Sequence, residues 1–247
     1  MRSDRFWATQ MQTLVHMVFP PRCLNCGGLV ETDFGLCSDC WKDTRFISGL
    51  GCDLCGTPLP GQSGESELCD DCLATPRPWQ QGRAALVYSG VGRRLVLSLK
   101  HGDREDIAQP AAQWMARVTR SIVTPDTLVI PVPLHLHRHL ARRYNQSALL
   151  ARCLAKQLGC DWCPDALHRH RATPSLDGKS RAERFETLAG RISVSSLRAD
   201  LLQDRPVLIV DDVMTTGATL TACAEACLAA GARSVCTSVL ARVAQDA

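Results

Sequence analysis

An apolar run that stops at two acidic residues constrains the fold of this chain more than any other feature. Residues 207–210 are apolar and mostly branched, and Pro206 precedes them, which is typical of a buried parallel strand. Asp211 and Asp212 stand at the predicted carboxyl end of that strand. The run therefore predicts an α/β fold with two carboxylates at the edge where parallel sheets bind their ligands.

A loop of small residues and a helix follow the acid pair. Apolar residues recur at helical spacing from Leu220 to Leu228, and the three threonines of the loop are available to cap the first turn. Free N–H groups at a helix start attract a phosphate, whereas carboxylates bind sugar hydroxyls or hydrated Mg²⁺. The run thus predicts a ligand with both phosphate and ribose, unless the acids only end a strand and the threonines only cap a helix. The predicted phosphate loop is Met214, Thr215, Thr216, Gly217, Ala218 and Thr219.

Eight of the fourteen cysteines form four Cys-x-x-Cys pairs before residue 73. Each pair closes a tight knuckle that places two thiolates on one metal ion, and two knuckles complete a tetrahedral zinc site. Consecutive pairing predicts two structural Zn²⁺ ions in a double zinc ribbon over residues 21–76, and interleaved pairing remains open. The predicted ligands are Cys23, Cys26, Cys37 and Cys40 for one ion, and Cys52, Cys55, Cys69 and Cys72 for the other.

A disulfide framework is the alternative for these cysteines, and it requires an oxidising compartment. Residues 1–20 have the apolar spacing of an amphipathic helix rather than of a secretion signal. No run approaches the length of about eighteen apolar residues that a membrane span needs. We therefore expect a cytoplasmic protein with no membrane span, in which reduced cysteines bind zinc.

The remaining chain alternates between strand-like and helix-like segments after a boundary at Pro76 and Pro78. This alternation predicts a Rossmann-like parallel sheet in a second domain over residues 80–247. The expected strands are residues 83–88, 127–132, 207–210 and 234–240, and the expected helices are residues 106–122, 144–158 and 219–230.

The formal net charge is only +3, but the basic residues are clustered. Such clusters suit an anionic ligand or a DNA backbone, and a solvated helix face is the equally weighted alternative. One cluster is Arg138, Arg142 and Arg143 beside His135, His137 and His139; the other is Arg169, Arg171, Lys179, Arg181 and Arg184.

The combination of a double zinc ribbon with the acid pair and phosphate loop resembles the ComF family, whose second domain is a class I phosphoribosyltransferase. The likeness covers nearly the whole chain. Besides the two ends, it rests on Leu99-Lys100, on the run from Val129 to His135, on Arg143-Tyr144-Asn145-Gln146 and on Ser180-Arg181-Ala182-Glu183-Arg184.

The resemblance implies that the ligand is 5-phosphoribosyl 1-pyrophosphate (PRPP), bound with Mg²⁺. Asp211 and Asp212 would meet the ribose hydroxyls, and the loop after them would hold the 5-phosphate. Lys100 and Arg143 are the candidate contacts of the diphosphate, and no residue stands out as a general base. The position of the pyrophosphate loop is occupied by Pro131, Val132, Pro133, Leu134 and His135.

The resemblance also implies a role in DNA uptake or in the use of DNA as a nutrient, together with other DNA-uptake proteins. Residues 169–188 would form the mobile loop, but Leu176 replaces the usual glutamine and Thr187 the usual asparagine. PRPP binding is therefore expected, and transferase turnover, the acceptor base and the oligomeric state stay open. The alternative is a non-catalytic factor that binds single-stranded DNA through its ribbons and basic clusters, with Trp41, Trp79 and Tyr144 as stacking platforms.

Overall fold

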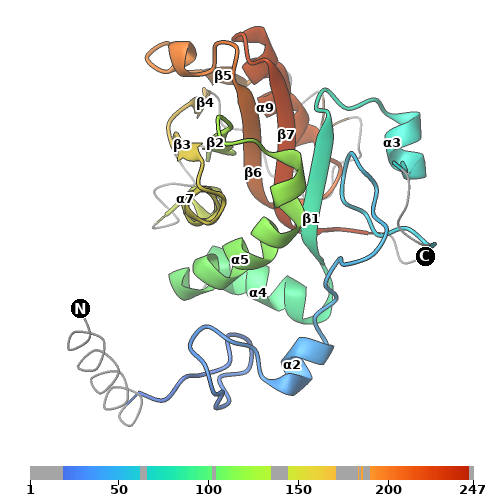
Figure 1. Ribbon diagram of the computed structural model, residues 1–247, viewed down its shortest axis with the longest axis vertical. Coiled ribbons are helices and arrows are strands. Elements are labelled where there is room, and N and C mark those ends of the chain that lie inside the picture. The colour runs from blue at the N-terminus through green and yellow to red at the C-terminus, as the bar shows by residue number, and fades with distance from the viewer. Residues whose placement is uncertain are drawn as a thin grey trace.

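The computed structural model describes residues 19–61, 66–101, 104–134, 144–170, 183, 185 and 190–244 (Figure 1). The amphipathic helix expected over residues 1–20 therefore lies almost wholly outside the described residues. Also outside the described residues are His135, Arg143, the first basic cluster and most of the second basic cluster. No helix within the described ranges is long and apolar enough to cross a membrane.

Five parallel strands form the central sheet, in the order β1-β7-β6-β2-β3 (Figure 1). The branched residues of β6 are buried on both faces, as its sequence predicted. The predicted parallel sheet is thus confirmed. The strands are β1 (Gln81–Val87), β2 (Leu128–Pro131), β3 (Asp161–Trp162), β6 (Pro206–Met214) and β7 (Ser234–Arg242), with a separate antiparallel pair, β4 (Leu167–Arg169) and β5 (Ile192–Val194).

Helices cover both faces of the sheet. Three of them, α4 (Gly90–His101), α5 (Ala108–Thr119) and α7 (Gln146–Leu158), share one apolar core with the sheet. The helix α9 (Ala218–Ala229) packs with β5 in the other core. Short helices complete the described chain: α2 (Ser38–Lys42), α3 (Asp70–Ala74), and the 3-10 turns η1 (Glu105–Ile107), η2 (Arg120–Ile122) and η3 (Ala199–Leu201).

Strand β6 is longer than the sequence predicted. It continues through the acid pair to Met214, because β7 pairs with it as far as Met214 and Arg242. Its pairing with β2 ends earlier, at Pro131 and Val210. Asp211 and Asp212 therefore lie inside a strand whose β2 side is open, rather than beyond the end of the strand.

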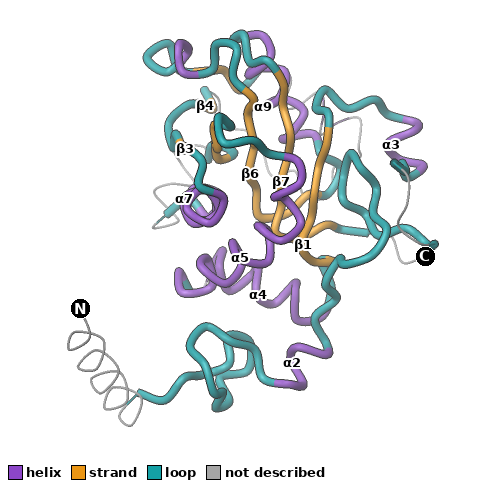
Figure 2. The backbone as a smooth tube through the Cα atoms, in the orientation of Figure 1, coloured by secondary structure: helices purple, strands orange, loops and turns teal. Residues whose placement is uncertain are grey.

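The second ribbon, residues 50–61 and 66–75, lies against the free edge of β1 (Figure 2). The N–H of Gly82 donates to the carbonyl of Asp53 at 2.7 Å, and the indole of Trp79 donates to Leu54 at 2.6 Å. A methyl group on Gly82 would lie 2.3 Å from the Leu54 oxygen, and one on Gly56 would lie 2.5 Å from the Ala84 nitrogen. The two backbones thus approach so closely that only glycine fits at these positions.

The first ribbon, residues 19–44, packs on helices rather than on the sheet. In Figure 1 it lies beyond α4 and α5, away from the strands. The guanidinium of Arg94 on α4 donates to the Asn25 side chain at 2.9 Å. Phe46, just after this ribbon, meets the ring of Trp114 on α5 edge to face at 5.4 Å. The two ribbons therefore have different neighbours, although their sequences are alike.

Replacing Gly82 with alanine should destabilise the protein by about 1–3 kcal/mol or more, because the added methyl group must push the second ribbon off β1. Urea denaturation measures this difference. Gly49→Ala is the matched control, since a methyl group there meets nothing within 4 Å, and its effect should stay within about 0.5 kcal/mol. Equal effects of the two substitutions would contradict the close approach.

Candidate phosphate site and metal centres

The structure gathers the eight cysteines of the ribbons into two groups of four. Within each group the sulfur atoms lie within 4.8 Å of one another, and the grouping is consecutive: Cys23, Cys26, Cys37 and Cys40, then Cys52, Cys55, Cys69 and Cys72. Two sulfurs on one zinc ion are about 3.8 Å apart in a tetrahedral site. The sulfurs of Cys26 and Cys37 are 3.7 Å apart, and those of Cys55 and Cys69 are 3.6 Å apart. Donor type and spacing both fit structural zinc.

Backbone and side-chain donors surround the sulfurs. The N–H of Cys37 donates to the sulfur of Cys23 at 3.3 Å, and the amide of Asn25 donates to that of Cys40 at 3.0 Å. Burial raises the pKa of the Cys23 thiol, but the backbone donors of Cys26, Cys37 and Asn25 outweigh burial and lower the pKa to about 6. Such donors favour the thiolate, which is the form that binds zinc.

Asp211 is held by two hydrogen bonds to a single oxygen. Its Oδ1 accepts from the hydroxyl of Ser147 on α7 at 2.7 Å and from the N–H of Asp212 at 2.9 Å. Burial and the neighbouring charge of Asp212 raise the pKa of the Asp211 carboxyl to about 7, although these two bonds and Lys100 oppose the rise. A carboxyl of this kind is ready to exchange a proton or to accept a cation near neutral pH.

Asp212 is ion-paired with the residue that was expected to contact a diphosphate. The ammonium of Lys100 on α4 lies 3.1 Å from Oδ1 of Asp212, and the aspartate side chain is only 10% exposed. The structure therefore brings Lys100 to the acid pair, in contact with a carboxylate.

The predicted phosphate loop lies at the start of α9 and encloses a hollow of about 30 Å³. Gly217 is the N-cap residue and adopts a left-handed conformation with φ of 83°. The helix has no side-chain cap from this residue, and Thr216 accepts from the N–H of Ala218 at 3.4 Å. Of the three threonines expected to be available for capping, Thr216 bonds the first N–H of the helix, and glycine occupies the cap position itself.

The segment at the pyrophosphate-loop position lies beside the acid pair. Pro131 ends β2, and the N–H of Val132 donates to the carbonyl of Val210 at 2.9 Å. The side chain of Asn145 donates to the carbonyl of Val132 at 3.1 Å. Pro133 is buried and Leu134 half-buried, so the described part of this loop is fixed by packing on both sides.

The run Tyr144 to Ser147 joins these segments. Asn145 caps α7 by accepting from the N–H groups of Ser147 and Ala148, at 3.0 and 3.3 Å. The hydroxyl of Tyr144 donates to the carbonyl of Leu99 at 2.8 Å, next to Lys100. The sequence analysis included this motif but not Ser147. The available signal was that Ser147 directly follows the motif and lies at a helix start.

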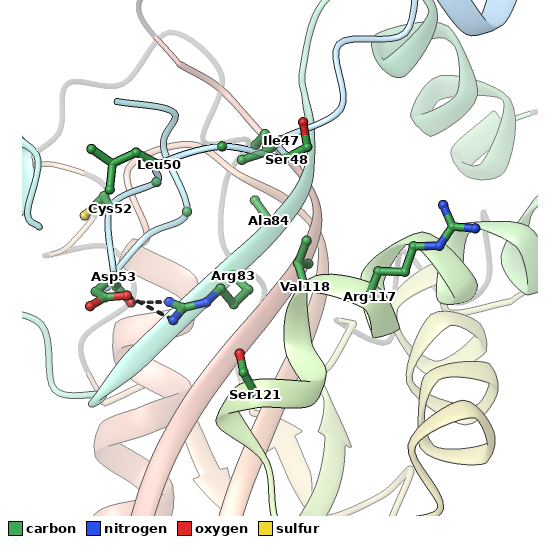
Figure 3. Close-up of a pocket in the computed structure, with 13 residues that line it drawn as sticks. Ile47, Ser48, Leu50, Cys52, Asp53, Arg83, Ala84, Arg117, Val118 and Ser121 are labelled. Carbon is green, nitrogen blue, oxygen red and sulfur yellow. Dashed lines mark hydrogen bonds and ion pairs between the residues drawn. The ribbon is translucent and has the colours of Figure 1, made fainter. Parts of the chain in front are cut away.

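A larger hollow of about 360 Å³ lies elsewhere, between the second ribbon, β1 and α5 (Figure 3). It contains none of the residues predicted to bind PRPP, although the predicted zinc ligand Cys52 lines it. Its Arg83 points to Asp53 and pairs with it at 2.9 Å, so this charge is already neutralised (Figure 3). The hollow is a junction between the ribbon and the sheet.

The expected stacking platforms are mostly covered. Trp79 is 2% exposed, so the expectation that it stacks with a base is wrong. Tyr144 is half-buried, with its hydroxyl bonded to the chain. Trp41 is 46% exposed and packs against Phe46, with ring centroids 4.5 Å apart.

The fold and the two cysteine clusters define a double zinc ribbon joined to a phosphoribosyltransferase domain. Family models agree, since that of the double zinc ribbon domain matches residues 14–73 and that of the phosphoribosyl transferase domain matches residues 145–247.

Three curated relatives match most of the chain. The DNA utilization protein YhgH of Escherichia coli (strain K12) is 35% identical over 210 residues, which cover 82% of this chain and 88% of the relative. YhgH of Salmonella typhi is 35% identical over 228 residues, 89% of this chain and 96% of the relative. Competence protein ComFC of Bacillus subtilis (strain 168) is 27% identical over 224 residues, 87% of each. The chain belongs to the ComF family.

Metal analysis of the purified protein should find two zinc ions per chain. Removal of zinc by a strong chelator should unfold the ribbons, because metal binding contributes about 10–16 kcal/mol to small sites of this type. Circular dichroism and limited proteolysis follow the loss. A chelated protein whose first 75 residues resist protease as well as the zinc-loaded protein would contradict the structural role.

The raised pKa of Asp211 gives a pH dependence with a definite sign. The unfolded carboxyl ionises near pH 4 and the folded one near pH 7, so stability falls as the pH rises through this range. From pH 6 to pH 8 the loss should be about 1.4 kcal/mol in urea denaturation. Asp211→Asn should abolish it and keep both hydrogen bonds to Oδ1. Asp200→Asn, at an exposed carboxyl, is the control and should leave the dependence intact.

Proposed function

We propose that this protein binds PRPP together with Mg²⁺ at the phosphate loop and acid pair, as a cytoplasmic member of its family acting in DNA uptake or utilisation. The single observation that carries the proposal is the start of α9. It combines a glycine at the N-cap position, which has no side chain to bond the first turn, with a hollow lined by the loop itself. An anion is the natural ligand of such a helix start.

The 5-phosphate would bind at residues 214–219. Thr215 is an exposed residue and Thr219 a half-buried one, and both lie beside the N-cap of α9. Phosphate oxygens accept hydrogen bonds from threonine hydroxyls and from the N–H groups of a helix start. Gly217 lets the backbone come near the ligand without a side chain in between.

The ribose would lie over the acid pair. Asp211 and Asp212 offer the oxygen donors that sugar hydroxyls and a hydrated Mg²⁺ prefer. A bound Mg²⁺ would neutralise charge on the diphosphate and would favour the ionised form of Asp211, whose pKa is raised without it. Strand β2 pairs with β6 only as far as Val210, so no β2 residue pairs with the acid pair.

Lys100 has two partners in this proposal. In the protein without ligand it neutralises Asp212 at 3.1 Å. When the diphosphate binds, the ammonium group would turn from the carboxylate to the phosphate oxygens, for which a lysine is a suitable point charge. Arg143 and His135 are proposed to contact the same diphosphate.

The cellular role is proposed from the relatives. Their printed names refer to DNA utilization and to competence. We infer that this chain acts in one of these processes, with other DNA-uptake proteins and single-stranded DNA as its partners. The proposed ligand is chemically related to that setting, because PRPP contains the phosphoribosyl unit from which nucleotides are built.

PRPP chemistry would proceed by displacement of pyrophosphate from C1 by a nitrogen nucleophile. In such reactions the protein mainly positions the reactants and stabilises charge. Asp211 can exchange a proton near neutral pH, but its Oδ1 is held by Ser147 and by the N–H of Asp212, so we do not assign it as a general base. We therefore limit the proposal to PRPP binding and regard turnover as the question that follows it.

Calorimetric titration of PRPP with Mg²⁺ tests the proposal. The wild-type protein should bind saturably, and the double substitution Asp211→Asn/Asp212→Asn should weaken binding at least tenfold, about 1.4 kcal/mol, because it removes both carboxylates. Asp200→Asn should bind like wild type. A folded, zinc-loaded wild-type protein that does not bind PRPP would overturn the proposal and would favour the single-stranded DNA alternative.

A further inference from the structure

Two buried arginines lie between the second cysteine cluster and the phosphate loop. Arg77 follows α3 and is 9% exposed, and Arg242 ends β7 and is 3% exposed. A buried guanidinium group needs hydrogen-bond acceptors and a negative charge nearby. The contacts of these two residues therefore show which parts of the protein depend on them.

Arg242 binds the loop from the sheet side. Its Nη1 donates to the carbonyls of Met214 and Thr215, at 3.3 and 2.8 Å, and also to that of Val243. Its Nη2 lies 3.9 Å from the carboxylate of Asp71, which is next to the cysteine ligand Cys72. One side chain thus contacts both the first residues of the phosphate loop and the helix that carries half of the second cluster.

Arg77 binds the next residue of the loop. Its Nη1 donates to the carbonyl of Thr216 at 2.8 Å, and its guanidinium lies 5.5 Å from the ring centre of Trp79. A methyl group on Gly217 would be 2.9 Å from this Nη1 and 3.4 Å from Trp79. The cap glycine of α9 therefore packs directly on Arg77.

The rest of the Arg77 guanidinium is buried, and its Nε and Nη2 atoms have no hydrogen-bond partner. Its negative counterpart is the second cysteine cluster. Arg77 interacts with the side chain of Cys72, and the charge of Arg242 acts on Cys55. Both cysteines are buried in the same apolar core as Met214 of the loop. Both arginines thus lie beside this cluster.

The two buried guanidinium groups offset the charge of the cluster when it holds zinc. A divalent ion with four thiolates carries two negative charges, and the two buried guanidinium groups carry two positive ones. The first cluster has a different environment. Two arginines bind its ribbon: Arg94 contacts Asn25, and Arg104 contacts the carbonyl of Leu24. Within the described residues, neither arginine contacts the loop.

We propose that Arg77 and Arg242 are positioning residues through which the second zinc cluster, but not the first, holds the phosphate loop in the conformation that binds its ligand. This inference rests on the proposed PRPP site. Without the cluster's negative charge the two guanidinium groups would remain buried beside the loop with too few partners. The loop carbonyls that they hold would then lose their fixed positions.

The first test replaces Arg77 with methionine, which keeps most of the volume but removes the charge and the donors. Hydrogen exchange of the peptide containing residues 214–220, measured without ligand, should become at least tenfold faster, and PRPP affinity should fall at least tenfold. Arg77→Lys should give an intermediate exchange rate, because one ammonium replaces the planar group. Arg94→Met, which removes an arginine from the first ribbon, should leave both quantities unchanged.

The second test removes one zinc ion at a time. Cys69→Ser should lose one zinc ion per chain and accelerate exchange of the loop peptide, whereas Cys26→Ser should lose one zinc ion and leave that peptide protected. The zinc content, together with slow hydrogen exchange of β6 residues 206–210, establishes that each variant is folded. If a cysteine variant loses this protection of β6, Arg77→Lys is measured in its place.

The outcomes separate the two proposals. Unchanged loop exchange in folded Arg77→Met, or equal acceleration in Cys26→Ser and Cys69→Ser, would overturn the coupling. If wild-type protein does not bind PRPP, the proposed function fails, but the exchange measurements still decide whether the second cluster holds the loop.

Discussion

The contact between the second ribbon and the free edge of β1 is the interaction on which the rest of the structure depends. A strand edge leaves backbone groups unpaired, and proteins cover such edges. Here the chain before and within the second ribbon does so. Ile47 donates to Ala85, Gly82 donates to Asp53, and Val87 donates to Arg45, at 2.7–2.9 Å. The cysteines of this ribbon share an apolar core with α9 and the sheet. Metal centre, sheet edge and phosphate loop therefore form one packed unit.

The acid pair, in contrast to the ribbon contact, lowers the stability of the protein. Two adjacent carboxylates in a partly buried site repel each other, and Asp211 gives up its charge near neutral pH as a result. Ser147 and Lys100 offset part of this cost by one hydrogen bond and one ion pair. Sites that bind ligands often keep such unfavourable arrangements, because the ligand supplies the missing compensation.

The elements of this fold that depend on short-range sequence patterns were predicted correctly. The strand before Asp211, the helix after Gly217 and the cysteine knuckles all follow from spacing within about ten residues, and each is present. Helix α4 was missed because Gly90 and Gly92 at its start weaken the helical pattern, although Val91, Leu95 and Leu99 have the right spacing. Arg77 and Arg242 could not be found in this way. The bond from Arg77 to Thr216 spans 139 positions, and only the folded chain brings these residues together.

The strand order has a consequence for how the protein is made. Strand β1 pairs with β7, so that Gln81 lies opposite Cys236, and no strand lies between them in the sheet. The ribosome delivers the ribbon cysteines and β1 long before β7 and Arg242. All eight cysteines of the two clusters are thus made while the sheet still lacks its inner strand β7. Strand β1 must be protected from wrong partners until β7 follows.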